Sequence, residues 1–445
     1  MSNRMLNKSG ARWAGSLLVV LTGLAVAAPA GAVPQIMTAY GDQMPWVQAE
    51  INAMGGSGTA LYRGGLSNIY NPAFLSVETS WRLDAGFSLD QEHEDRFQPL
   101  FDTFNSWVTD AAIASNREHY WQTGFALAKR VLEGERPLSV GLSLTDRYPF
   151  QYRFWEELRN PSPFYGDVAR DQVIERRERE VTGTLRDLSL GVGWTVDDIF
   201  SVGAAAHYAF GTRKEVRTVR DYVDLDGDQS YNQVAKKKLD GVNFTLGVRG
   251  LVSERVELGL AWESQLAATG DLETTYYDAA TDTATFTSEH AYLRYPNRYR
   301  AGLTFFPRTD PRTVFTIEVE LVEWSEMADS EIPGYDNPQN FNDGKDVRIG
   351  LQHTFYNGAP LRFGFRHFDS YADKESTVSV FSTGVGVPYG DGMFSASVEL
   401  SKVTGYLAHQ FPYPDDYFGD QYEADPTARV EDTRFRFGVS YNVSF

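Results

Sequence analysis

Apolar side chains alternate with small or polar ones along most of the chain from residue 77 onward. Side chains two positions apart share one face of a strand, so each such run predicts a strand with one apolar and one polar face. The clearest runs are Trp81–Leu89, Leu138–Leu144, Leu188–Trp194 and Phe435–Phe445. The pattern predicts about fourteen strands, near 77–90, 116–130, 137–148, 178–196, 199–216, 236–252, 255–270, 288–307, 312–326, 345–357, 359–371, 376–387, 391–404 and 431–445.

The connections between these runs alternate in length. Short turns fall near residues 133–136, 197–198, 253–254, 307–311, 357–358 and 389–390, while most of the others are long and acidic. Short periplasmic turns opposite long external loops, with an even strand number, are typical of outer-membrane barrels. We therefore predict an all-β fold, a transmembrane antiparallel β-barrel over 77–445. A soluble β-sandwich is the alternative, although it gives no reason for this segregation of loop lengths.

The first 32 residues have the order of a secretory signal peptide. Arg4, Lys8 and Arg12 precede a short apolar run, and small residues follow at Ala30 and Ala32. This order predicts export and cleavage after Ala30 or Ala32. A single-pass anchor is the alternative, but the run is shorter than the ~20 residues that a spanning helix needs.

Composition narrows the class of partner. The 445-residue chain has 60 acidic and 41 basic side chains, a formal charge of −19, and no cysteine. The acidic balance argues against nucleic acid as a partner, and neither a disulfide nor a thiolate-metal framework is possible. Aromatic residues reach 14 %, which suits interfacial girdles against membrane lipid and also hydrophobic ligand sites.

The last predicted strand carries Tyr441 and finishes on Phe445. A terminal aromatic residue on an alternating strand is a recognised feature of chains handled by the outer-membrane insertion machinery. We therefore expect that machinery as a partner during biogenesis and the outer membrane of a Gram-negative bacterium as the location.

Before the first strand lies a glycine-rich segment that leads to Asn71-Pro72-Ala73. It resembles the N-terminal region of the FadL-type transporters of long-chain fatty acids and hydrocarbons, where a Gly/Ala-rich stretch precedes an Asn-Pro-Ala triplet. The segments 295–303, 322–324, 346–350 and 361–365 are similar to later strands of that family. The resemblance implies a fourteen-stranded barrel with an N-terminal hatch inside, and transport of hydrophobic molecules. The Tyr62-Arg63-Gly64 stretch departs from the family pattern, and related barrels with the triplet also serve secretion systems.

Residues 33–76 are accordingly predicted to form the hatch, with Gly55, Gly56, Asn71, Pro72 and Ala73 as gate residues. Glycine lets a backbone turn tightly inside a narrow lumen, and proline sets a rigid bend. A flexible periplasmic tail before the first strand is the alternative.

Two predicted external loops are rich in aromatic residues. In the first, apolar residues recur at steps of three and four, which indicates an amphipathic helix stripe; in the second, rings either extend a strand or line the same site. Such surfaces either hold a hydrophobic ligand or pack against neighbouring loops. The candidate ligand-binding residues are Phe97, Leu100, Phe101, Phe104, Trp107, Phe150, Phe154 and Trp155.

Asp224, Asp226 and Asp228 have the spacing that opens a calcium loop. The glycine and glutamate that complete such a loop are missing, so a solvated turn is the alternative. The sequence has no serine-hydrolase elbow, no His-Glu-x-x-His and no phosphate-binding glycine loop. We predict neither an enzyme nor a cofactor; a catalytic site assembled from residues far apart in the sequence is the remaining alternative.

The favoured function is passive uptake of a hydrophobic small molecule through the outer membrane. The alternatives are a barrel that binds a protein partner in a secretion or envelope-assembly complex, and a general porin.

Overall fold

The computed structural model describes residues 40–41, 47–101, 107–160, 169, 172–223, 230–307, 312–329, 341–371, 377–411 and 427–445. Two short helices and a 3₁₀ turn precede the sheet: α2 (Ala49–Asn52), α3 (Ser67–Tyr70) and η2 (Pro72–Val77). The strands are β1 (Arg82–Phe101), β2 (Trp107–Leu132), β3 (Leu138–Arg159), β4 (Val173–Thr195), β5 (Phe200–Asp221), β6 (Tyr231–Ser253), β7 (Val256–Glu263), β8 (Leu266–Asp278), β9 (Thr283–Tyr295), β10 (Arg298–Phe305), β11 (Thr313–Val322), β12 (Ala328–Asp329), β13 (Gly344–Thr354), β14 (Pro360–Asp369), β15 (Thr377–Tyr389), β16 (Gly392–Ala408) and β17 (Thr427–Ser444).

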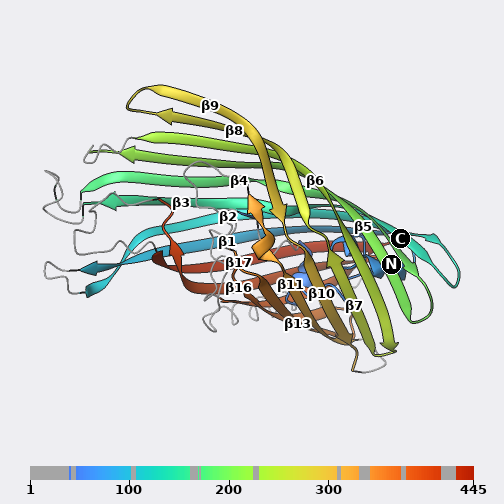
Figure 1. Cartoon of the computed structure of the whole chain (residues 1–445). Helices are drawn as coiled ribbons and strands as arrows, with labels where there is room; N and C mark the ends of the chain where they lie inside the picture. Colours follow the sequence, from blue (N-terminus) through green and yellow to red (C-terminus); the bar gives the residue numbers. More distant parts are fainter. Residues whose placement is uncertain are drawn as a thin grey trace, which may run out of the picture.

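These segments form one closed antiparallel barrel (Figure 1). β1 pairs with β17 from Arg82–Ser444 to Phe97–Arg429, which closes the sheet. β6 pairs with both β7 and β8, so these two segments are halves of one interrupted strand; β9 and β10 form the next strand in the same way. The short β12 lies in the connection that also holds the 3₁₀ turn η3 (Trp324–Glu326). The predicted all-β barrel of fourteen strands is confirmed, and every predicted strand overlaps an observed one.

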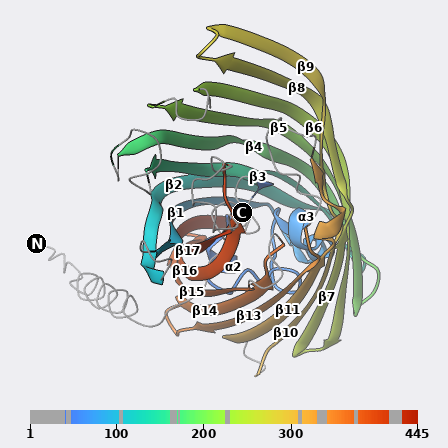
Figure 2. The same cartoon turned by 60° about the vertical axis from the view of Figure 1, so that its left-hand side comes forward.

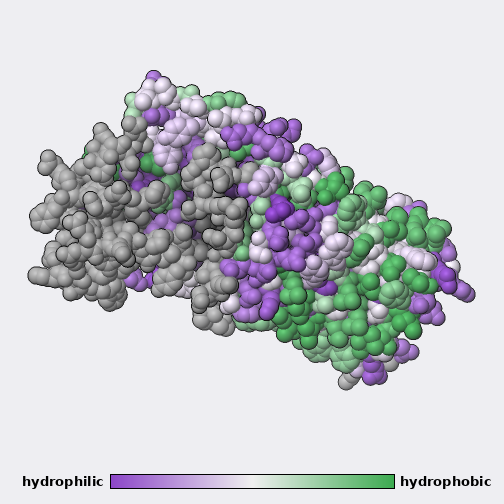
Figure 3. Space-filling view, in the orientation of Figure 1, coloured by the Kyte–Doolittle hydropathy of each residue, from purple (hydrophilic) through white to green (hydrophobic). Residues whose placement is uncertain are grey.

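Large apolar side chains cover the outside of the barrel between two polar zones (Figure 3). On β1, the outward-facing residues from Trp81 to Leu89 are apolar and those from Gln91 to Asp95 are polar. The apolar part spans about 26 Å along the strand at ~3.3 Å per residue. At a strand tilt of ~40° this is about 20 Å in height, close to the ~25 Å apolar band of an outer-membrane barrel. The alternation seen in the sequence is therefore an apolar exterior and a polar lumen.

The strands differ greatly in length above this band. β1 to β6 and the β8–β9 hairpin continue well beyond it, whereas β10, β11 and β13 to β15 are short (Figure 1). The amphipathic helix predicted near residues 97–108 is wrong, because Phe97 and Phe101 lie in β1 and Trp107 begins β2. The apolar spacing favoured a helix locally, but hydrogen-bonded pairing of β1 with β2 and β17 makes this segment a strand.

The segment before β1 folds inside the barrel. α2 and α3 lie within the ring of strands when the barrel is viewed along its length (Figure 2), and η2 contacts β3, β4, β5 and β6. Among the described residues, none of the helices is long and apolar enough to span a membrane.

Candidate functional site

The hatch is a plug of buried residues. Between Val47 and Ser76 every residue except Glu50, Leu61 and Arg63 is buried. The sequence here is rich in Gly, Ala, Ser and Asn, which allows a short chain to pack close to the wall. A lumen filled in this way is closed to bulk water at the level of the apolar band.

Asn71 ties the hatch to the wall. Its side-chain Nδ2 donates hydrogen bonds to the Thr59 carbonyl at 3.0 Å and the Val248 carbonyl at 2.9 Å. Its Oδ1 accepts a bond of 3.1 Å from the Ala73 amide and so caps η2, in which Pro72 is the first residue. Asn fits the cap position and Pro the first helical position for general reasons. The Asn-Pro-Ala triplet is thus a structural joint between the hatch and β6.

Other hatch groups bond to strands around the rest of the lumen. The Gly55 amide donates to Ser382 Oγ at 3.1 Å, the Thr59 amide to Glu318 at 2.8 Å and the Gly65 amide to Asp84 at 3.1 Å. Gly55 and Gly56 have φ of 70° and 82° after α2, a left-handed backbone that favours glycine. The plug is held from many sides at once.

Inward-facing glycines on the strands make room for this plug. At Gly247 an added Cβ would lie 2.0 Å from Asn71 Oδ1, and at Gly203 it would lie 2.3 Å from the Ala73 amide. Similar close approaches to the hatch occur at Gly86, Gly141, Gly191, Gly193, Gly259, Gly350 and Gly364. The wall is therefore built to receive this segment.

Above the hatch, side chains that face the lumen form a buried apolar cluster, and we call this set of residues the chamber. Four rings of β3 contribute to it, because Tyr148, Phe150, Tyr152 and Phe154 all face inward. Tyr148 stacks on Tyr295 with ring centroids 3.8 Å apart. The remaining wall comes mainly from β4, β6, β8, β9, β14 and β15, through Val181, Leu185, Leu239, Leu266, Leu272, Leu293, Phe368, Val378 and Val380.

Arginines stand among these rings. The Arg213 guanidinium lies 5.9 Å from the Phe150 ring and that of Arg179 lies 5.5 Å from the Tyr152 ring. Both arginines also pair with Glu215 at 2.9 Å, as does Arg217. Three guanidinium groups therefore converge on one carboxylate at the side of the chamber that also carries these rings. Guanidinium groups are the donors that bind carboxylates most strongly.

The wall of the barrel is split beside the chamber. β2 pairs with β3 only from Leu132–Leu138 up to Gly124–Thr145. Above that point β2 still pairs with β1 up to Trp107, and β3 with β4 up to Arg159. The result is a gap between the upper parts of β2 and β3. Its lower end lies in the apolar band, beside the exposed side chains of Trp121, Phe125 and Leu144.

A few side chains span this gap. Asp146 Oδ2 accepts hydrogen bonds from the amide of Thr123 at 2.8 Å and from its hydroxyl at 2.9 Å. Higher up, Asn116 Oδ1 accepts a bond of 3.2 Å from the Trp155 amide. Because single side-chain bonds replace a backbone ladder, this seam is weaker than a continuously paired one such as β3–β4.

Buried charges connect the gap to the hatch. Between Asp146 and Tyr148 the register of β3 against β4 shifts by one residue, so Arg147 points into the lumen. It binds Glu263 at 2.6 Å, and Glu263 also binds Arg300. Arg300 donates to the carbonyls of Ile69 and Tyr70 at the end of α3, the latter at 2.9 Å. Removing one member of such a buried set takes an opposite charge away from its neighbours, which destabilises the fold.

The predicted site residues fall into three groups. Gly55, Gly56, Asn71, Pro72 and Ala73 lie together in the hatch, and Phe150 and Phe154 lie in the chamber. Phe97 and Trp155 were expected beside them, but Phe97 packs under Arg429 at 4.3 Å and Trp155 packs under Arg176 at 5.5 Å. Trp155 faces outward because residues of a strand alternate between its faces.

The backbones of Leu100, Phe101 and Trp107 belong to β1 and β2, while Phe104 and the aspartates Asp224, Asp226 and Asp228 lie outside the described residues. In the described part of the chain, no group of three or more His, Asp or Glu side chains could hold a metal ion. At the closing seam, Phe445 exchanges backbone hydrogen bonds with Trp81, and Tyr441 packs on Phe394.

Sequence reasoning missed the gap and the Arg147–Glu263–Arg300 set. β3 gave a partial signal. Its apolar residues occupy even-numbered positions throughout, yet Leu138, Val140, Leu142 and Leu144 face outward whereas the rings at 148, 150, 152 and 154 face the lumen. One extra residue between the two runs, the bulge at Arg147, explains this change of face.

The fold and site together define a plugged membrane-type β-barrel with an apolar chamber above its hatch. Comparison with solved structures shows which barrels it matches. A FadL homologue of Pseudomonas aeruginosa superposes with a TM-score of 0.63 at 13 % identity, covering 91 % of this chain and all of the other. The toluene transporter TodX of Pseudomonas putida gives 0.62 at 12 % identity, with 91 % and 99 % covered. The toluene transporter TbuX of Ralstonia pickettii gives 0.55 at 14 % identity over the same shares.

These likenesses show that the chain has the FadL-type fold, as the Asn-Pro-Ala segment predicted. Two of these three solved structures, TodX and TbuX, are named as toluene transporters. No protein-family model matches the sequence, and no curated protein matches it.

Proposed function

We propose that this barrel lies in the outer membrane and passively takes up hydrophobic small molecules. The observation that carries the proposal is the apolar chamber directly beside a split in the wall whose lower end opens at the apolar band. A general porin needs a polar, open lumen, whereas here the hatch fills the lumen and its upper part is lined by rings.

The route has three steps. A molecule enters the chamber from outside and displaces water from the rings of Phe150, Tyr152 and Phe154. The hatch loosens at Asn71, and the gap between β2 and β3 widens where Asp146 bridges it. The molecule then leaves sideways into the membrane, where its apolar part stays out of water. No covalent step and no energy source are required.

The chamber suits both ligand classes named by the sequence resemblance, fatty acids and neutral hydrocarbons. The three arginines around Glu215 favour a molecule with a carboxylate. We therefore infer that the barrel takes up fatty acids in preference to neutral aromatic hydrocarbons.

The test is uptake of a radiolabelled long-chain fatty acid and of toluene by cells that lack their own outer-membrane transporters for both. Wild-type barrel should raise uptake at limiting concentration, and Phe150→Asn with Phe154→Asn should abolish the increase. Trp155→Asn, a neighbouring ring that faces outward, is the matched control. Uptake equal to that of empty cells, or a stoichiometric protein partner recovered with an empty barrel, would favour the assembly role instead.

The gap can be tested separately, because the chain has no cysteine. A disulfide between Thr123→Cys and Asp146→Cys should block uptake, and reduction should restore it. The control disulfide joins Thr184→Cys and Thr212→Cys, register partners on the continuous β4–β5 seam. Equal uptake with the gap locked would refute the lateral route while leaving the chamber in place.

A further inference from the structure

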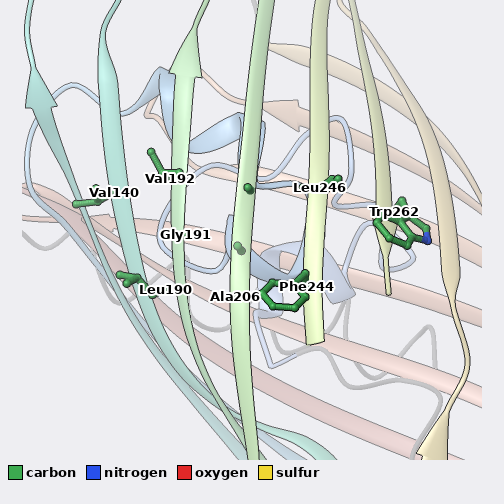
Figure 4. Close-up of a pocket in the computed structure, with 10 residues that line it drawn as sticks. Val140, Leu190, Gly191, Val192, Ala206, Phe244, Leu246 and Trp262 are labelled. Atoms are coloured by element: carbon green, nitrogen blue, oxygen red, sulfur yellow. The ribbon is translucent and has the colours of Figure 1, made fainter. Parts of the chain in front are cut away.

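An apolar groove lies on the outer wall of the barrel, lined by residues of β3 to β7 (Figure 4). Its floor is formed by Ala204 and Ala206 of β5, whose small side chains face outward between longer neighbours. Leu190 and Val192 stand on one side and Phe244, Leu246 and Trp262 on the other. The hatch lies behind these strands, on the lumen side (Figure 4).

Three exposed lysines stand above this groove on the same outer face: Lys214 of β5, and Lys236 and Lys238 of β6. Lys214 and Lys236 are direct cross-strand partners, and the other partner of Lys214 is the uncharged Thr182. Like charges directly opposite each other destabilise a sheet. None of the three ammonium groups forms an ion pair with a described residue. This is unexpected in a chain with 60 acidic and 41 basic side chains.

Four exposed carboxylates lie around this cluster. Asp271 and Glu273 of β8 are the cross-strand partners of Lys238 and Lys236, and Asp240 lies two residues below Lys238. On β4, Glu180 lies diagonally from Lys214, two residues from its direct partner Thr182. The residues directly opposite Lys214 are Thr182 and Lys236, and neither of them is acidic. An anion bound between Lys214 and the other two lysines would remove their repulsion.

The spacing of the cluster and the groove fits one leaflet of a membrane. Lys238 is six residues above Phe244 on β6, and Lys236 and Lys214 are eight residues above Phe244 and Ala206. These spacings are about 20 to 26 Å along the strands and about 15 to 20 Å in height at a tilt of ~40°. One leaflet contributes about half of the ~30 Å hydrocarbon core. A phosphate at the lysines therefore places its acyl chain against the groove.

We propose that this face, given the outer-membrane location proposed above, is a specific binding site for a phosphorylated lipid of the outer leaflet. The phosphate lies between Lys214, Lys236 and Lys238, and one acyl chain fills the groove over Ala204 and Ala206. We expect a lipid rather than a soluble phosphate compound, because the groove lies in the apolar band. A soluble compound could reach the lysines but would leave the groove empty.

The test uses the full barrel in mild detergent, with bound lipid counted by native mass spectrometry. The probes are a bisphosphorylated, multiply acylated glucosamine disaccharide, the same lipid without phosphate, and inorganic phosphate. The wild-type barrel should hold one phosphorylated lipid with at least tenfold preference over the dephosphorylated form.

Two variants separate the parts of the site. Lys214→Gln with Lys236→Gln and Lys238→Gln should weaken binding of the phosphorylated lipid at least tenfold, and Ala206→Phe should weaken it by blocking the groove. Lys345→Gln on β13 and Ala301→Phe on β10 are outward-facing controls that should bind as wild type. Unchanged binding by the triple variant, or equal binding of the dephosphorylated lipid or of inorganic phosphate alone, would overturn the proposal. Heat-modified gel mobility checks that each variant is folded.

Discussion

Asn71→Ala should loosen the hatch without unfolding the barrel. The side chain makes three hydrogen bonds, to the carbonyls of Thr59 and Val248 and from the amide of Ala73. Two of these partners belong to the hatch itself and one belongs to β6. The substitution removes all three bonds but touches no strand pairing, so the barrel remains closed.

The size of the effect follows from these bonds. A neutral buried hydrogen bond contributes about 1 kcal/mol, and a helix-capping side chain is worth a similar amount. All three bonds are lost when the hatch leaves the wall and loses its own fold, and counting each once gives a loss of about 3 kcal/mol for the docked hatch. Because ~1.4 kcal/mol corresponds to a factor of ten, the fraction of barrels with a displaced hatch should rise by roughly two orders of magnitude.

Single-channel recording in planar bilayers measures that fraction directly. The wild-type barrel should be closed almost all the time, because its lumen is plugged. Asn71→Ala should show frequent openings of the same conductance, with about a hundredfold greater open time. Equal conductance levels matter, since a larger pore in the variant would indicate a damaged wall rather than a moving hatch.

Asn243→Ala is the matched control. Asn243 is also a buried asparagine on the lumen face of β6, but its Nδ2 donates to the carbonyl of Ser264 in the wall, at 3.1 Å. It should leave the open time unchanged. A change of less than threefold for Asn71→Ala in a correctly folded barrel, or the same change in both variants, would refute the reasoning.

Three further outcomes are expected. Gly247→Val, whose Cβ would lie 2.0 Å from the Asn71 amide oxygen, should displace the hatch further than Asn71→Ala and leave residues 47–77 open to protease in intact outer-membrane preparations. Arg300→Met, which leaves Glu263 with one arginine fewer and frees two carbonyls at the end of α3, should lower the free energy of unfolding by about 3 kcal/mol, read from urea unfolding by tryptophan fluorescence. Arg213→Met should reduce fatty-acid uptake at least tenfold but toluene uptake less than twofold; equal losses for both ligands would argue against a head-group site.

The sequence predicted the strands well, because each membrane-facing strand must alternate to keep one face in lipid and the other in the lumen. The runs at Leu138–Leu144 and Leu188–Trp194 lie where the alternation places them. Above the apolar band that constraint relaxes, and so the sequence did not predict how far β1, β2 and β4 extend. The stripe at Phe97 and Phe101 was misinterpreted as a helix because apolar steps of three and four also arise within two paired strands joined by a turn.

The hatch was predicted from its glycines and from Asn71-Pro72-Ala73, which are local signals. Its partners were not predictable, since Val248 and Thr304 are distant in sequence and bond to it only through the closed barrel. The gap was not predictable for a similar reason. It depends on one extra residue at Arg147 and on the point where pairing between β2 and β3 ends, and neither feature changes the composition of either strand.

One consequence of this arrangement concerns how a passive barrel can open at all. The hatch and the gap share a chain of contacts, because Arg300 holds the end of α3, Glu263 holds Arg300, and Arg147 joins Glu263 at the bulge where β2 and β3 separate. A displacement of either element must therefore disturb the other. In the passive uptake that we propose, a ligand can shift this equilibrium only by its difference in affinity between the closed and open states. We expect the rings of β3 to supply that difference, since a molecule held against Phe150 and Tyr152 would act on the strand that carries both the bulge and one edge of the gap.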